Sequence, residues 1–265
     1  MKGSRMKLVW QQPLHVRSFD VGAGGRLRVD ALMGLWQEAA NAHTQACHIG
    51  VRDLMARGLT WVLSRYRLCI ERLPLMDEAL TARTWPSGLD ERFTLRNFEL
   101  RDAEGEILAR AVTSWVLFDL KAHAPISPGL VVSPEIIVDE QIIDAPFQKM
   151  PDFDEANAQG ARELDIGVQD RDLDINGHVG HAVYPQWAFE AIAPEEKRAL
   201  AIRDIEVSYR AEARQSEVVR ARVRAIDGTG GQRAFVHQIL NRDTGRELAR
   251  LVSRWRLKGR GASGH

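Results

Sequence analysis

The chain has 265 residues, 45% of them hydrophobic and 27% charged, which suits one large globular domain or two of about 100–150 residues each. Its 36 basic and 36 acidic residues balance, so no global charge favours nucleic acid or a membrane surface, and any basic docking surface must be local. Two cysteines exclude a disulfide framework and suit a reducing compartment. No apolar run approaches the ~20 residues that span a bilayer. The apolar stretch after the basic N-terminus is too short for a signal peptide, so we expect a cytoplasmic protein.

The sequence pattern of the first half predicts one helix followed by a run of strands. Asp30 is a good N-cap residue, and helical spacing of apolar residues follows it, at Leu32, Leu35, Trp36, Ala39 and Ala40. Strand-like segments then occur near 60–70, 80–84, 93–100 and 107–120, separated by turn residues. One helix followed by antiparallel strands is an α+β pattern.

A proline-rich, acidic segment separates two halves of similar plan. Pro125, Pro128 and Pro134 interrupt the strand pattern, and the residues to about 160 lack periodicity. A short strand near 165–168, a helix around Trp187 and strands from 205 to 257 then repeat the plan. We therefore predict an N-terminal domain at 1–128, a surface linker at 129–160, a C-terminal domain at 161–258 and a flexible tail at 259–265.

The two halves also share sequence. Residues 107–117 and 247–257 are identical at six of eleven positions, at an offset of 140 residues. This similarity indicates a tandem duplication of a helix-plus-sheet unit. Two such units can join their sheets edge to edge into one continuous sheet, which removes two exposed edges.

The second half carries a polar cluster just before its helix. Asp174, Asn176 and His178 are spaced at i, i+2 and i+4, which places all three side chains on one side of an extended chain, and Gly177 allows a sharp turn. Such residues can orient, donate and transfer a proton, but Asp and Asn also form structural turns. The first half has no Asp-x-Asn-x-His. Because a turn needed only for folding should occur in both copies, we interpret the cluster as functional.

The segment Asp172–Val179, followed by Tyr184, Trp187 and Glu190, resembles the second half of acyl-acyl-carrier-protein (acyl-ACP) thioesterases of the plant and bacterial fatty-acid type. Residues 205–213 resemble the second catalytic segment of that family, and residues 35–39, 59–62 and 113–116 match its first half. The resemblance covers about 19–257. It implies an α+β tandem (double) hotdog, each half a helix wrapped by an antiparallel sheet, with acyl-chain binding in the first half and catalysis in the second.

By this resemblance, the catalytic positions carry over to Asp174, Asn176, His178 and Glu212. Ala213 stands where the family often has cysteine, so a Cys–His mechanism is excluded. The family's usual Asn-Asn after His-Val is Gly180-His181 in this chain. We expect His181 to be a polar residue of the first helical turn, and His237, on an apolar strand face, to be a core histidine.

The expected reaction is hydrolysis of a fatty acyl-ACP thioester, releasing free fatty acid. With no cysteine or adjacent serine, the nucleophile is either water or a carboxylate. We expect water, activated by Glu212 with His178 sharing the proton work; direct attack by Glu212 or Asp174 is the alternative. Taken alone, Glu212 beside Arg210 and Arg214 also fits a solvated loop carboxylate. Hydrolysis of acyl-CoA and a non-catalytic acyl-binding role remain alternatives.

The resemblance also defines partners. We expect no cofactor and no metal, since no His, Cys and carboxylate spacing fits a metal site. An acyl tunnel is expected along helix 32–40 with Trp61, Leu63 and Trp85. An acidic carrier protein is expected to dock on arginines of the second half. The alternative interpretation is that these arginines only form the solvated face of the strands. The arginines are Arg203, Arg210, Arg214, Arg220, Arg222 and Arg224. No nucleic acid or membrane span is expected, and a homodimer is left open.

Overall fold

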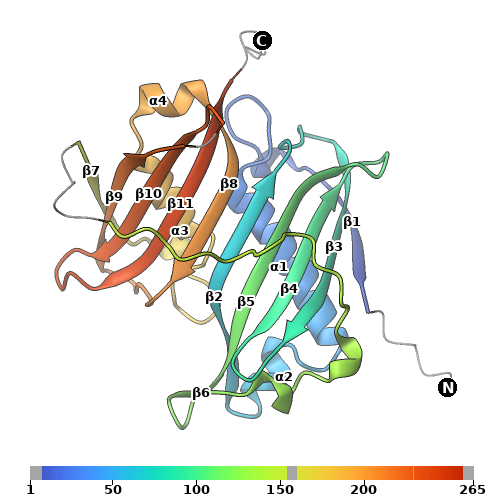
Figure 1. The fold of residues 1–265 in the computed structure, drawn as a ribbon. Coiled ribbons are helices and arrows are strands. Elements are labelled where there is room, and N and C mark those ends of the chain that lie inside the picture. The colour runs from blue at the N-terminus through green and yellow to red at the C-terminus, as the bar shows by residue number, and fades with distance from the viewer. Residues whose placement is uncertain (1–7, 154–159, 229, 259–265) are drawn as a thin grey trace. The chain divides into compact units, whose positions relative to one another are not determined.

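A computed structural model describes residues 8–153, 160–228 and 230–258 (Figure 1). The chain forms two compact units. The first contains the residues up to Tyr66 and Glu71–Pro146; the second contains Arg67–Ile70 and the chain from Phe147 onward. The tail predicted at 259–265 and linker residues 154–159 lie outside the described residues. The predicted domain limits stay a prediction.

The first unit is an antiparallel sheet covered by one long helix. Its strand order is β1-β3-β4-β5-β2, with β6 beside β5. The strands are β1 (Trp10–His15), β2 (Leu59–Ile70, whose last four residues count with the second unit), β3 (Ala79–Leu89), β4 (Thr94–Arg101), β5 (Ile107–Asp119) and β6 (Ala124–Ile126). The helices are η1 (Ser18–Asp20), α1 (Val29–Ala46), α2 (Val51–Met55), η2 (Pro128–Leu130) and η3 (Pro134–Ile136).

The helix α1 packs on the sheet through the apolar residues that the helical spacing predicts. Trp36 is fully buried; its ring centroid lies 5.7 Å from that of Phe98 on β4, and its indole nitrogen donates to the Glu99 carbonyl. The predicted N-cap is wrong by two residues, because Arg28 caps the helix and Asp30 lies in its first turn. In the first turn, the Asp30 carboxylate interacts favourably with the positive end of the helix dipole. It also accepts a hydrogen bond from Arg28.

The segment predicted as a surface linker is partly buried in the first unit. Val132 and Ile136 pack with Ile49 in a small apolar cluster. The Glu140 carbonyl accepts hydrogen bonds from the side chains of Asn97 and Trp85. Trp85 therefore faces this segment. Its placement along an acyl tunnel under α1 is wrong, because the strand alternation turns Thr84 toward the helix instead.

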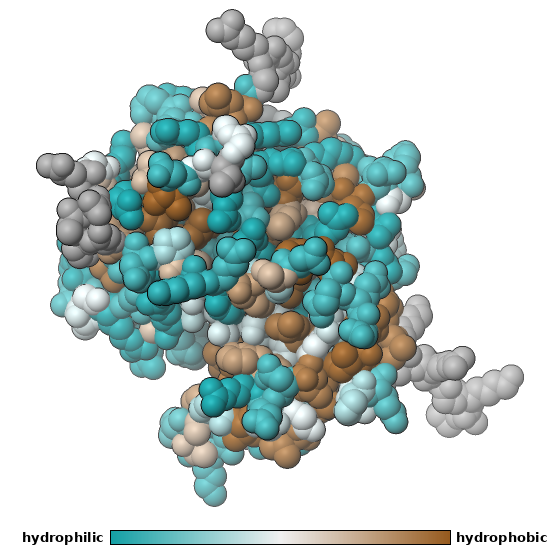
Figure 2. Space-filling view, in the orientation of Figure 1, coloured by the Kyte–Doolittle hydropathy of each residue, from teal (hydrophilic) through white to brown (hydrophobic). Residues whose placement is uncertain are grey.

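On the helix side, Thr84 and His43 of α1 both lie 3.2 Å from the guanidinium of Arg96, a buried residue. Apolar side chains also gather on the surface of this unit. In Figure 2 they lie in the lower part of the view, where Figure 1 places α2, β6 and the short turns after it. Leu130 of η2 is 65% exposed.

The second unit repeats the first with a shorter helix. Its strand order is β7-β9-β10-β11-β8, which is the order of the first unit with each strand replaced by its counterpart. The strands are β7 (Arg162–Gly167), β8 (Leu200–Tyr209), β9 (Val218–Ile226), β10 (Arg233–Asn241) and β11 (Glu247–Leu257). The helices are η5 (Asp170–Asp172), α3 (Val183–Glu190) and α4 (Pro194–Ala199).

The duplication inferred from sequence is confirmed by this topology. The two similar segments are the counterpart strands β5 and β11. The helix α3 has 8 residues against 18 in α1, and it packs through Tyr184, Trp187 and Ala188. His237 on β10 is fully buried, with Nε2 2.8 Å from the Ser253 hydroxyl, so it is a core residue as predicted. Among the described residues, no helix is long and apolar enough to cross a membrane.

Candidate active site

The predicted polar cluster forms a tight turn between η5 and α3. Oδ1 of Asp174 accepts hydrogen bonds from the backbone N–H of Asn176 at 2.8 Å and of His178 at 3.3 Å. The Asp174 N–H donates to the His178 carbonyl at 2.7 Å, which closes the turn. Gly177 has a φ of 74°, a left-handed conformation that favours glycine. The turn therefore fixes the position from which His178 projects.

The β8–β9 loop brings Glu212 to this turn. The Val179 N–H donates to the Ala213 carbonyl at 3.2 Å, and an antiparallel bridge pairs His178 with Arg214. As a result, Nε2 of His178 lies 3.4 Å from Oε2 of Glu212, although 34 residues separate them in sequence. Both side chains are partly open to solvent. Such a pair can exchange a proton with a bound water.

The four predicted site residues therefore lie on two adjoining segments. Asp174 binds the turn's own amides, and His178 contacts Glu212. Asn176 lies on the same turn with an exposed side chain, free to meet a substrate. Ala213, the residue after Glu212, is buried. It stands at the position where the resemblance would place a cysteine.

Two tyrosines join these segments, and neither was predicted to matter. The hydroxyl of Tyr184 on α3 accepts a hydrogen bond from the Ala213 N–H at 3.0 Å. The hydroxyl of Tyr209, at the end of β8, donates to the His181 carbonyl at 2.9 Å. Burial, together with the charge of nearby carboxylates, raises the pKa of Tyr184 to about 12, so the phenol is neutral at physiological pH. The sequence signal was their position within the two motif segments.

His181 directly follows the turn and lies two residues before the start of α3. It keeps some exposed surface, yet the protein surrounds its ring enough for desolvation to lower its pKa to about 4, against the opposing charge of Asp174. The imidazole is therefore neutral at pH 7. Its carbonyl, rather than its ring, is engaged by Tyr209.

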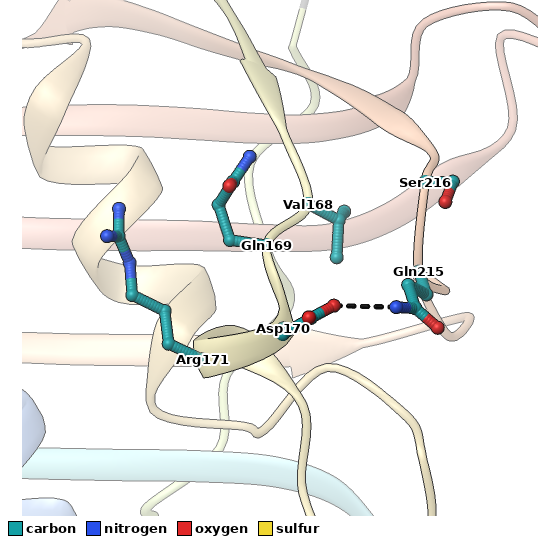
Figure 3. A pocket seen from close by; sticks show the side chains of 6 residues that line it. All are labelled: Val168, Gln169, Asp170, Arg171, Gln215 and Ser216. Atoms are coloured by element: carbon teal, nitrogen blue, oxygen red, sulfur yellow. Dashed lines mark hydrogen bonds between the residues drawn. The ribbon is translucent and has the colours of Figure 1, made fainter.

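A polar pocket lies beside the turn (Figure 3). One wall is the segment leading into the turn, and the other is the loop after Glu212. It is lined by Val168, Gln169, Asp170, Arg171, Gln215 and Ser216. Gln215 donates to Asp170 at 2.6 Å across the pocket, and Figure 3 shows Arg171 pointing away from that pair. The polar lining suits a hydrophilic group and not an acyl chain.

The same backbone turn also occurs in the first unit, at 22–26. The Gly22 N–H donates to the Arg26 carbonyl at 2.9 Å, as Asp174 does to His178, and Gly25 has a φ of 69°. The Leu27 N–H donates to the Pro74 carbonyl, as Val179 does to Ala213. The expectation that the turn would be absent from the first copy is therefore wrong. Each unit uses this turn to enter its helix.

What differs between the copies is the side chains. Gly22, Gly24 and Arg26 stand in the first copy where Asp174, Asn176 and His178 stand in the second, and Leu73 takes the place of Glu212. The turn is thus a feature of the fold, whereas the polar residues are confined to the second copy. Among the described residues, no group of three or more His, Cys, Asp or Glu side chains could hold a metal ion.

Two successive helix-covered antiparallel sheets of the same strand order define an α+β double hotdog. Solved structures share this fold: the 12:0-ACP thioesterase from Umbellularia californica (TM-score 0.84, 22% identity, covering 96% of each chain) and an acyl-ACP thioesterase from Bacteroides thetaiotaomicron (TM-score 0.79, 21% identity, covering 94% of this chain and 98% of the other). Sequence models of the acyl-ACP thioesterase N-terminal and C-terminal domains match residues 7–133 and 155–257. The chain belongs to the acyl-ACP thioesterase family.

Curated relatives agree with this assignment. A chloroplastic acyl-[acyl-carrier-protein] hydrolase from Cuphea viscosissima is 26% identical over 271 residues, which cover 97% of this chain and 65% of the relative. A palmitoyl-acyl carrier protein thioesterase from Cuphea hookeriana is 26% identical over 270 residues, covering 95% of this chain and 63% of the relative. The chain thus spans slightly less than two thirds of the length of these relatives.

Proposed function

We propose that the protein hydrolyses the thioester of fatty acyl-acyl carrier protein, releasing free fatty acid and ending chain elongation. The observation that carries the proposal is the contact between His178 and Glu212 on the turn, in a chain of the acyl-ACP thioesterase family. Relatives named acyl-ACP hydrolases support the same reaction. The counterpart turn of the first unit lacks these side chains, which favours a single hydrolytic centre in the second unit.

The chemistry of the site favours water as the nucleophile. Glu212 takes a proton from water, whose oxygen attacks the thioester carbonyl, and the C–S bond then breaks. His178, 3.4 Å away, shares the proton and returns it to the departing thiolate. Asn176, exposed on the turn, can donate its amide to the developing oxyanion. Asp174 already accepts two backbone hydrogen bonds, which favours an orienting role over direct attack.

Carrier-protein docking is proposed on two exposed arginines beside the site. Arg171 lines the polar pocket, and Arg214 pairs with His178 along the backbone. Three arginines predicted to dock the carrier protein instead bind acidic side chains. Arg210 pairs with Glu247, Arg220 with Asp165 and Arg222 with Glu163. The local basic surface is therefore narrower than the arginine count suggests.

Turnover of a ladder of acyl-ACP thioesters, from medium to long chains, tests the proposed function. The acyl-CoA of the same chain length is assayed beside each. We expect free fatty acid and one thiol per turnover, with acyl-ACP preferred. Preference for the CoA thioester would support the acyl-CoA alternative. Tight acyl-ACP binding without thiol release would support a non-catalytic acyl-binding protein.

A cytoplasmic location and a homodimer are proposed as well. The plant relatives are named chloroplastic, so the location rests on composition rather than on likeness. Fractionation of cells that express the native gene tests the location, and light scattering of the purified protein tests the dimer.

A further inference from the structure

We propose that Tyr184 and Tyr209 are positioning residues that hold Glu212 at its working distance from His178. The inference rests on the proposed function, because it assigns a purpose to that His178–Glu212 contact. Neither tyrosine is proposed to touch the substrate. Each acts through the backbone of the segment opposite its own.

The two hydroxyl groups bind reciprocally. Tyr184 follows the turn in sequence and receives the N–H of Ala213, the residue after Glu212. Tyr209 precedes Glu212 in sequence and donates to the carbonyl of His181, just after the turn. Their ring centroids lie 5.6 Å apart at an interplanar angle of 83°, an edge-to-face arrangement that packs the two against each other. Each catalytic segment is therefore tied to the other twice.

The first copy of the turn provides an internal comparison. Counting from the shared turn, the position of Tyr184 is taken by Leu32. The position of Tyr209 is taken by Ile70, because Glu71 and Arg72 bind the Leu108 carbonyl as Arg210 and Ala211 bind the Leu248 carbonyl. The first copy thus builds the same turn without either hydroxyl group. The fold of the turn does not require the two tyrosines.

The residue that meets Tyr184 changes in step with it. Ala213 has an N–H that needs a partner when buried, and the tyrosine hydroxyl supplies one. Pro74 holds that place in the first copy and has no N–H, so an apolar Leu32 leaves nothing unsatisfied. The hydroxyl groups accompany Glu212 and His178, and both are absent where Leu73 and Arg26 replace those residues. This pattern points to positioning of the site.

Tyr184→Phe and Tyr209→Phe, each made alone, test the proposal through kinetics. A misplacement of about 1 Å can lower turnover about 100-fold, so we expect kcat to fall about 10- to 100-fold with KM changed less than about threefold. Tyr66→Phe, at the remaining tyrosine of the chain, is the control and should change neither. Unchanged kcat in both site variants, with the fold intact, would overturn the proposal.

A double variant separates positioning from simple satisfaction of a buried amide. The double variant Tyr184→Leu, Ala213→Pro copies the first unit and removes the Ala213 N–H and the Tyr184 hydroxyl together. Its melting temperature should therefore return to that of the wild type. We expect kcat to stay low, because Glu212 is no longer tied to α3. Full recovery of kcat would show that the hydroxyl serves only to satisfy the amide, and would overturn the positioning role of Tyr184.

Coupling to the catalytic pair provides a third readout. In a Glu212→Gln background, Tyr184→Phe and Tyr209→Phe should lower residual turnover no further, since residues acting as a unit are not additive. Additive losses would indicate a general structural role and contradict the proposal.

Hydrogen exchange of the Ala213 amide tests the tie without any assay of activity: protection should fall in Tyr184→Phe. Absence of wild-type hydrolysis would refute the proposed function, whereas retained Ala213 protection would refute the tie.

Discussion

Nε2 of His178 lies 3.4 Å from Oε2 of Glu212, and this contact is imposed by backbone hydrogen bonds rather than by the two side chains themselves. Val179 and Ala213, their chain neighbours, form the adjoining backbone bond at 3.2 Å. The tight turn at Asp174 fixes one partner, and the β8–β9 loop fixes the other. Changes to either support should therefore affect turnover through the same pair.

Glu212→Gln should lower kcat by about 10²–10⁴, the usual contribution of a general base, because the amide cannot take a proton from water. The melting temperature should change little, since the side chain is 51% exposed. Glu195→Gln on α4, which is 76% exposed, is the matched control. Steady-state kinetics on acyl-ACP provide the measurement. A fully active Glu212→Gln protein would exclude Glu212 as the base.

Substitutions at Asp174 should separate turn formation from charge. Asp174→Ala removes the acceptor of two backbone N–H groups and should lower both the free energy of unfolding, by about 1–2 kcal/mol, and kcat. Asp174→Asn keeps an acceptor oxygen, so we expect stability near wild type. Denaturant unfolding and kinetics on both variants measure the two effects. Equal instability of both would mean that the negative charge, and not the hydrogen bonds, supports the turn.

Gly177→Ala and Gly25→Ala form a matched pair across the duplication. Both glycines have a left-handed φ and no atom within 4 Å of an added Cβ, so each substitution should cost about 1–2 kcal/mol from backbone strain alone. Only Gly177→Ala should lower kcat at a temperature where both proteins are folded, since only that turn carries His178. A comparable loss of kcat in Gly25→Ala would argue against a single hydrolytic centre.

Acid should destabilise the protein through two histidines whose rings are shielded from water, His237 and His181. Burial lowers the pKa of His237 to about 3 and of His181 to about 4, below the ordinary 6.5. Between each lowered pKa and 6.5, the unfolded chain binds a proton that the folded chain does not. The contribution of the two histidines to the free energy of unfolding is therefore complete above about pH 6.5 and falls toward pH 4. Thermal melts from pH 7.5 to 4.5 measure this. His237→Asn should flatten the curve; a curve identical to wild type would contradict the assignment.

Charge reversal at Arg214 should weaken carrier-protein binding mainly through electrostatics. Arg214→Glu is expected to raise KM for acyl-ACP severalfold at low salt and much less at high salt, because ions screen exposed charges. Arg242→Glu, at an exposed arginine paired with Asp243, is the control. An equal rise in KM at both salt concentrations would show that Arg214 does not act by long-range attraction.

Much of the fold was predictable because apolar periodicity and the repeat are recorded in local sequence. Leu32, Trp36 and Ala39 are buried at the expected helical spacing, and the two similar segments are counterpart strands. The start of α1 was missed, since Arg28 has no side chain that caps a helix by hydrogen bonding. Trp85 was placed on the wrong face of the sheet because a strand pattern does not say which face the helix covers.

The sequence named the candidate site residues, but it did not indicate the backbone contacts that hold them. Asp174, Asn176, His178 and Glu212 stay predicted site residues, named by motif resemblance, and the structure places them on adjoining segments. That Gly22–Arg26 forms the same turn could not be anticipated, because its hydrogen bonds are made by backbone atoms and its sequence shares one glycine with the second copy. The reciprocal bonds of Tyr184 and Tyr209 depend on tertiary packing between α3 and β8.

The most direct test is release of fatty acid from a purified acyl-ACP by the wild-type protein and by a His178→Ala, Glu212→Gln double variant. The wild type should liberate free fatty acid and one carrier-protein thiol per turnover, and the double variant, folded and still binding acyl-ACP, should lose at least about 10²-fold in kcat. Equal release by both proteins would contradict the assignment of hydrolysis to the His178–Glu212 pair.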